Sequence, residues 1–170
     1  MKKIILLIPV FLILVACSNE KANENIDITQ EIKFSAKNFV NNTFAYKQND
    51  VVKLGVTKDE LLSSFNNYST KFKLGSEAKS YLIEEISNKN YVRFFHEDGL
   101  VSTVALIPNA EISKKLPSII TYRSGSTVCT TTYCSNCCGC IPEGKYCTPC
   151  ELIAEDCKRT TTGSGPVPIG

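Results

Sequence analysis

Eight of the nine cysteines lie between Cys129 and Cys157, and this density limits what the end of the chain can fold into. The stretch CTTTYCSNCCGCIPEGKYCTPCELIAEDC holds few large apolar side chains, so it cannot bury a hydrophobic core of its own. Segments of this kind are held together by disulfides or by a metal ion. The choice depends on the redox state of the compartment, which the start of the chain indicates.

The first 16 residues have the composition of a secretory signal peptide. Two lysines, Lys2 and Lys3, precede the apolar run IILLIPVFLILVA. This run is shorter than the roughly 20 apolar residues that a transmembrane helix needs, and Pro9 interrupts it. We therefore expect the chain to leave the cytosol.

The end of this run, Leu14-Val15-Ala16-Cys17, resembles the lipobox of bacterial lipoproteins. The resemblance implies removal of residues 1–16, attachment of a diacylglycerol to Cys17 and acylation, for example with palmitate, of the new amino terminus. Several acyl chains hold a protein firmly at a membrane. Residues 17–25 would then form a lipidated tether. The protein would lie in the cell envelope, on the outer side of the cytoplasmic membrane or in the outer membrane. An ordinary secretory signal is the alternative.

Removal of the signal peptide changes the charge and the cysteine count. The loss of Lys2 and Lys3 leaves 17 basic residues against 17 acidic ones. A neutral chain without a basic run does not attract nucleic acid, so the expected partners are the membrane and an unidentified envelope protein. With Cys17 lipidated, eight cysteines remain, and an even number in an exported chain is typical of a disulfide framework.

Residues 26–128 predict one small α+β domain in which helices come first and antiparallel hairpins follow. Apolar residues at helical spacing run from 28 to 44. A second helix begins at Thr57, where Glu60 stands three residues later as in a capping box. A third helix is favoured over residues 76–87, with a buried strand as the alternative.

Turn residues predict the hairpins in the second half of this domain. Asp98-Gly99 separates two β-rich runs and predicts a type I′ turn. Pro108 ends the second run, because proline cannot donate to a strand ladder. Ser124-Gly125 predicts another turn, and the Gly/Pro/Thr-rich residues 159–170 predict a flexible tail.

The middle domain shows no recognisable catalytic pattern. His96, the single histidine, stands beside the Asp98-Gly99 turn and is expected to be solvated. We find no Ser–His–Asp set and no glycine-rich phosphate loop. The sequence therefore does not predict an enzyme.

The cysteine-rich module, residues 129–158, has the spacing C-x4-C-x2-CC-x-C-x6-C-x2-C-x6-C. We interpret its cysteines as disulfide-bonded, because export, even number and density agree. Up to four bridges would form, among 105 possible connectivities. The predicted disulfide residues are Cys129, Cys134, Cys137, Cys138, Cys140, Cys147, Cys150 and Cys157.

Zinc binding is one alternative for this module. Cys134 and Cys137 form one C-x2-C pair, and Cys147 and Cys150 form another. This spacing lets two sulfurs of each pair face one tetrahedral ion. Soft thiolates suit Zn or Cu(I), so these four residues are the candidate metal ligands.

Thiol–disulfide exchange is the other alternative. The stretch YCTPC, residues 146–150, is similar to the active-site motif of thioredoxins. The resemblance implies that Cys147 is the attacking thiol, that Pro149 matches the proline of the motif, and that Cys150 is the resolving thiol. Only 20 residues follow Cys150, which is too few for the strands and helices that complete that fold.

The order of a region of about a hundred residues and an eight-cysteine segment resembles proteins related to fulvocin C, a small disulfide-rich bacteriocin. That resemblance implies a secreted effector. A stapled module on a lipid-anchored domain is more typical of binding than of catalysis. The sequence thus favours an envelope lipoprotein with a binding or structural role.

Overall fold

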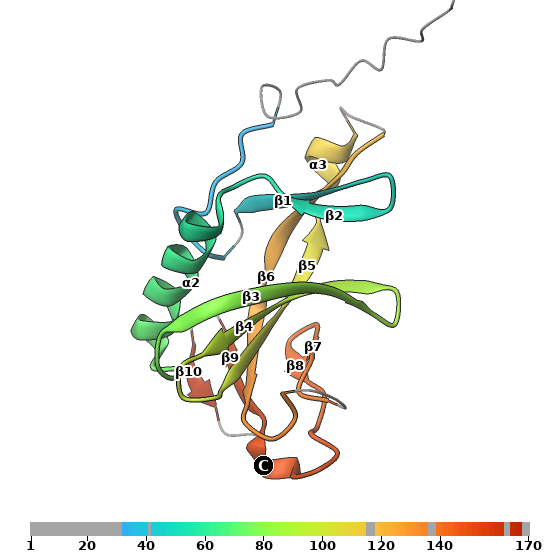
Figure 1. The fold of residues 1–170 in the computed structure, drawn as a ribbon. Coiled ribbons are helices and arrows are strands. Elements are labelled where there is room, and N and C mark those ends of the chain that lie inside the picture. The colour runs from blue at the N-terminus through green and yellow to red at the C-terminus, as the bar shows by residue number, and fades with distance from the viewer. Residues whose placement is uncertain (1–31, 41, 115–117, 136–138, 162–163, 168–170) are drawn as a thin grey trace, which may run out of the picture.

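The computed structural model describes residues 32–40, 42–114, 118–135, 139–161 and 164–167. In this part of the chain, an antiparallel sheet of eight strands curves into a nearly closed barrel, and one long helix packs against it (Figure 1). The strands of the sheet are β1 (Thr43–Gln48), β2 (Val51–Leu54), β3 (Ala78–Ile86), β4 (Lys89–His96), β5 (Val101–Pro108), β6 (Ile120–Thr131), β9 (Lys158–Thr161) and β10 (Ser164–Val167). The other elements are the helices α2 (Lys58–Phe72) and α3 (Ala110–Ser113), the short strands β7 (Pro142–Glu143) and β8 (Tyr146–Cys147), and the 3-10 turn η1 (Ala154–Asp156).

Strand β6 is the centre of the sheet. The strands run in the order β10-β9-β6-β5-β4-β3, and β1 and β2 branch off from β6. One edge of β6 pairs with β5, while the other edge pairs first with β1 and then with β9. A register shift opposite Val104 to Leu106 bends the pair β5–β6. The bend and the two partners on one edge let the sheet curve around its core.

The predicted α+β fold with helices at its start is wrong, because the described chain is mostly β. The helix predicted from 28 to 44 does not form over the described residues 32–40, and Thr43 already begins β1. Apolar residues of this segment are buried, but not on a helix. Phe39 reaches the core from an irregular segment, and Phe44 reaches it from strand β1. Pairing of β1 with β6, far away in the sequence, decides the conformation.

The helix favoured over residues 76–87 is also wrong, and the strand alternative is right. β3 pairs with β4 from Ala78 to Ile86. Tyr81 and Ile83 are partly buried against the core, whereas Leu82 between them is exposed, as the period of a strand requires.

The turn predictions had mixed outcomes. The Asp98-Gly99 turn does join β4 to β5, but only Gly99 has a positive φ, of 82°, so the turn is not type I′. Pro108 is the last residue of β5, as predicted. The turn predicted at Ser124-Gly125 is wrong, because both residues lie within strand β6. Type I′ turns instead occur at residues 49–50 and 87–88, where all four φ angles are positive.

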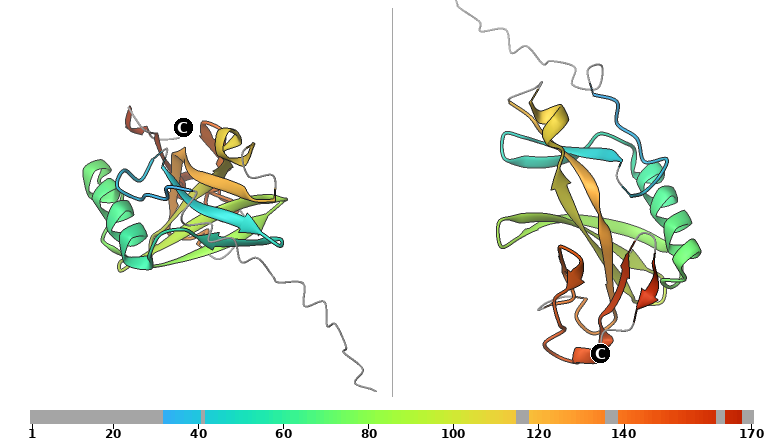
Figure 2. Two further views of the ribbon diagram at one scale, coloured as in Figure 1. Left: turned by 90° about the horizontal axis from the view of Figure 1, so that it is seen from above. Right: turned by 180° about the vertical axis from the view of Figure 1, so that it is seen from behind.

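Helix α2 closes one side of the curved sheet (Figure 2). The predicted capping box at its start is confirmed, since Thr57 and Glu60 bond each other's backbone N–H groups. Its face toward the sheet carries Leu61 and Phe65, which are fully buried, and the Phe65 ring stacks on Phe94 of β4 with centroids 3.8 Å apart. Burial of each such side chain contributes about 1.5–3 kcal/mol. The core around them contains Phe39, Phe44, Ala45, Tyr68, Leu74, Ala78, Val92, Val104, Leu106, Tyr122 and Val128.

The described chain starts at the end of the molecule that lies away from the cysteine-rich module. In Figure 1 and in the rear view of Figure 2, the first described residues lie near α3 and β1, and η1 and the β7–β8 hairpin lie at the opposite end. No helix among the described residues is both long enough and apolar enough to cross a membrane. The segment 159–170, predicted to be flexible, contributes residues 159–161 to strand β9 and residues 164–167 to strand β10.

We predict that Thr57→Ala lowers the free energy of unfolding by about 1 kcal/mol, because it removes the capping hydroxyl of α2. Urea unfolding followed by circular dichroism measures this loss. Thr70→Ala, at an exposed position within α2, is the control and should have no effect or a slight stabilising one. An equal loss in both variants would show that the cap does not stabilise the helix.

Candidate functional site

The cysteine-rich module is a closed loop on the sheet, since it leaves from the end of β6 and returns through β9. Six of the eight predicted disulfide cysteines are paired in the structure. The pairs are Cys129–Cys147, Cys134–Cys150 and Cys140–Cys157, with Cα–Cα distances of 5.8, 5.8 and 5.3 Å. Cys137 and Cys138 lie outside the described residues.

The three bridges interleave and form the core of the module. Each bridge spans 16 to 18 residues, and closure of a loop of this length contributes roughly 3 kcal/mol by restricting the unfolded chain. All six half-cystines are buried and pack together as one cluster. Gly139 fits beside them only as glycine, because a Cβ would lie 1.9 Å from the Pro149 carbonyl oxygen. The module therefore replaces a hydrophobic core with disulfides.

The structure does not join the two cysteines of the thioredoxin-like motif. Cys147 is bonded to Cys129, and Cys150 is bonded to Cys134. An exchange site of this type instead closes its own C-x-x-C pair. No α-helix follows the motif in the described residues, where only the three-residue turn η1 forms.

The zinc alternative needs free thiolates, and the described candidates are not free. Cys134, Cys147 and Cys150 each belong to a disulfide, and Cys137 lies outside the described residues. Within the described part of the chain, no cluster of three or more His, Cys, Asp or Glu side chains could hold a metal ion. The described donors therefore do not fit a zinc site.

Arg93 ties the module to the sheet. The side chain is buried on β4, and its Nη1 donates to Glu84 Oε1 at 3.2 Å. Its Nη2 donates to the main-chain oxygens of Cys134, at 3.4 Å, and of Ser135. A guanidinium presents its donors in a rigid fork, so it can hold a carboxylate and a loop at once.

Asp156 makes the second tie, at the end of β6. Its carboxylate accepts hydrogen bonds from the Thr131 hydroxyl and from the backbone N–H groups of Thr132 and Tyr133, at 2.9 and 2.8 Å. Burial by itself would raise the pKa of this carboxyl, but the hydrogen bonds from residues 131–134 outweigh it and lower the pKa below its ordinary value.

We predict that Asp156→Asn lowers the free energy of unfolding of the oxidised protein at pH 7 by about 1–3 kcal/mol. A lowered folded pKa contributes stability above the unfolded pKa, near 4, and this stability is lost as the pH falls through the folded value. The difference from the parent should therefore shrink as the pH is lowered below about 4, as urea unfolding at pH 7 and at pH 2.5 would measure.

Glu155→Gln is the matched control, because Glu155 is the adjacent carboxylate and its side chain is exposed. It should leave stability unchanged at both pH values. A loss in Asp156→Asn that is the same at pH 7 and pH 2.5 would contradict the role of the carboxylate.

His96 is buried, so the prediction that it is solvated is wrong. Its Nδ1 lies 2.6 Å from the Ser76 carbonyl oxygen and therefore carries the proton, while Nε2 lies 2.9 Å from Ser102 Oγ. Ser102 Oγ lies 2.8 Å from Thr130 Oγ1 and has no exposed surface. This serine–histidine pair joins three parts of the chain inside the fold and is closed to a substrate.

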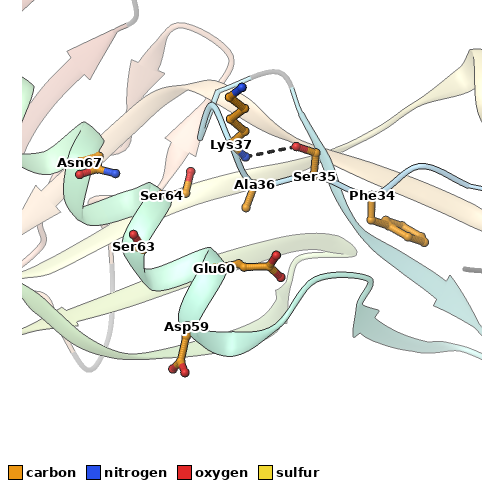
Figure 3. A pocket seen from close by; sticks show the side chains of 9 residues that line it. All are labelled: Phe34, Ser35, Ala36, Lys37, Asp59, Glu60, Ser63, Ser64 and Asn67. Atoms are coloured by element: carbon orange, nitrogen blue, oxygen red, sulfur yellow. Dashed lines mark hydrogen bonds between the residues drawn. The ribbon is translucent and has the colours of Figure 1, made fainter.

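An open groove runs along α2, where the segment 34–40 lies beside the helix. Its first part is a cavity of about 490 Å³ (Figure 3). Its second part, of about 320 Å³, shares Lys37, Ser64 and Asn67 with the first and continues toward the end of the helix. The first part is also lined by Phe34, Ser35, Ala36, Asp59, Glu60 and Ser63, and the second by Asn38, Phe39, Val40, Tyr68, Lys71 and Phe72. We call the two parts together the α2 groove.

The groove has charged ends of opposite sign. Asp59 and Glu60 lie at the end near the start of α2, whereas Lys37 and Lys71 line the second part. The backbone N–H of Thr57, and then its hydroxyl, lower the pKa of Glu60, so this carboxyl stays ionised as part of the cap. The sequence does not predict the groove, because the apolar spacing of residues 34–40 indicates a helix. The apolar positions of α2 marked its buried face, but no signal marked the groove wall.

Comparison with protein-family models, curated proteins and solved structures finds no match for this chain.

Proposed function

We propose that this chain is a lipid-anchored bacterial envelope protein with a binding or structural role. The observation that carries the proposal is the set of three interleaved disulfides in the module. Structural disulfides persist in oxidising compartments, which agrees with an exported chain. The lipobox-like residues Leu14 to Cys17 supply the expected anchor.

The arrangement of the fold supports presentation of the module away from a membrane. Fully extended, the chain from Cys17 to Ile32 would span at most about 55 Å. It joins the fold at the end opposite to the module (Figure 1). A lipid on Cys17 would therefore be attached at the end of the fold away from the stapled module, which leaves the module free to contact a partner.

Among the described residues, the cysteine and histidine side chains that could act as nucleophiles or bases are bonded or buried, and this favours binding over catalysis. The described cysteines of the module form buried disulfides, and His96 and Ser102 are sealed inside the fold. The α2 groove, in contrast, is open and lined by polar and charged side chains. A disulfide-braced barrel with an open polar groove is suited to hold a ligand rather than to transform one.

We predict that the parent chain, expressed in a bacterium with an alkyne-tagged palmitate analogue, becomes labelled and stays with the membrane fraction. Cys17→Ser should abolish labelling and leave the signal peptide uncleaved, because the lipid is attached to the thiol. Fluorescence after click coupling measures the label, and intact mass measures cleavage.

Ser18→Ala is the matched control and should leave labelling and fractionation unchanged. An unlabelled parent chain that is released into the medium would contradict the anchor and favour the effector role implied by the fulvocin C-related resemblance. Persistent label in Cys17→Ser would also contradict the proposed attachment site.

A further inference from the structure

Three buried hydroxyls on α2, those of Ser64, Tyr68 and Ser69, lack hydrogen-bond partners among the described residues. Ser64 and Tyr68, which are 6% and 8% exposed, also line the α2 groove. The two residues stand one helical turn apart and therefore share one face of the helix. Leaving a buried hydroxyl without a partner costs roughly 1–3 kcal/mol of folding free energy. A bound group that accepts hydrogen bonds from Ser64 and Tyr68 would recover part of this cost.

Both residues line the second part of the α2 groove, and Ser64 lines the first part as well. Figure 3 shows the Ser64 side chain on the side of α2 that faces Ala36 and Lys37. Burial raises the pKa of Tyr68 to about 12, so its phenol keeps its proton at neutral pH and can donate it in a hydrogen bond.

Two lysine residues line the same part of the groove. They are Lys37 and Lys71, and neither forms an ion pair with a described residue. The Lys71 ammonium lies over the face of the Phe72 ring, 5.6 Å from its centroid. The acidic residues Asp59 and Glu60 line only the first part. The second part therefore has net positive charge together with unused hydroxyl donors.

We propose that the second part of the α2 groove binds a carboxylate through Lys37, Lys71, Ser64 and Tyr68. A carboxylate has two oxygens and about four lone-pair positions, which four donors of this kind can satisfy. Hydrogen bonds between charged partners are about twice as strong as neutral ones. A phosphate has more acceptor positions and more charge, and no arginine lines this cavity to match them.

The rest of the groove gives room for the group that carries the carboxylate. The adjoining cavity of about 490 Å³ continues past Asn67 toward Phe34 and Asp59. Sites for small molecules occupy roughly 300–1,000 Å³, so either a free organic acid or the last residues of a peptide would fit. The carboxylate chemistry is common to both sources. It deepens the proposed binding role but does not depend on the lipid, so the labelling result on Cys17 stands whatever the groove binds.

The test uses the exported, non-reduced chain in NMR titrations with four probes: N-acetyl-tetraalanine with a free carboxylate, the same peptide as its amide, propionate and inorganic phosphate. We expect saturable shifts at Ser64, Asn67 and Tyr68 with the free-acid peptide or with propionate, and a dissociation constant below about 10 mM. A peptide that binds at least about tenfold tighter than propionate identifies a C-terminal carboxylate as the source. Equal affinities identify a free acid. Equal binding of the amide, a response to phosphate alone, or no saturable response to any probe would overturn the proposal.

Variants separate this site from general electrostatics. Tyr68→Phe should weaken binding of the carboxylate by about 5- to 10-fold, while the free protein keeps or gains thermal stability because an unpartnered hydroxyl is removed. Ser64→Ala should act in the same way.

The double variant Lys37→Gln/Lys71→Gln should weaken binding at least about 10-fold. Lys53→Gln/Lys114→Gln removes the same charge from exposed positions away from the groove and should leave affinity unchanged. An equal loss in both double variants, or full affinity in Tyr68→Phe, would also overturn the proposal.

Discussion

The pairing of strand β6 with its neighbours is the constraint on which the rest of the structure depends. One strand of 12 residues holds β5 along one edge and both β1 and β9 along the other. Cys129 lies within its paired length, so the first disulfide ties the cysteine-rich module directly to the centre of the sheet. The module is therefore an extension of the barrel. Arg93 and Asp156 hold the module in place through hydrogen bonds to the backbone of residues 132–135.

Two kinds of core stabilise the two ends of this molecule. Between α2 and the sheet, aromatic side chains pack densely, with Phe39 in contact with the rings of Phe44, Phe65 and Phe94. At the other end, half-cystines fill the interior. The first core needs no particular redox state, whereas the second exists only when the thiols are oxidised. This difference connects the fold to the compartment, and so to the proposed envelope role.

The local signal for the start of α2 was reliable, the local turn signals were only partly so, and signals that depend on distant partners were not. The capping box at Thr57 and Glu60 predicted the start of α2, because both groups act within one helical turn. Asp98-Gly99 predicted the position of a hairpin, although not its turn type. Residues 28–44 and 76–87 carry apolar spacing that fits a helix, but pairing with β6 and β4 turned the described parts of them into other structure. The burial of His96 arises from contacts with Ser76 and Ser102, which adjacent sequence does not reveal.

The two candidate sites also differ in how much of each can be predicted from the sequence. Density and even number identified the cysteines as a disulfide framework, but spacing alone cannot choose among 105 connectivities. The α2 groove exists because an irregular segment lies beside a helix, and nothing in the period of either one predicts that contact. The groove thus depends on the fold as a whole, while the module depends on its covalent bonds.

Non-reducing peptide mapping of the exported chain is the most direct test that the module is a set of structural staples. We expect peptides linked as Cys129–Cys147, Cys134–Cys150 and Cys140–Cys157, with none of these six thiols open to alkylation before reduction. A peptide containing an internal Cys147–Cys150 bridge, or alkylation of several of the six thiols in the folded protein, would contradict this expectation. Either result would make the thiols themselves, and not the groove, the place to look for function.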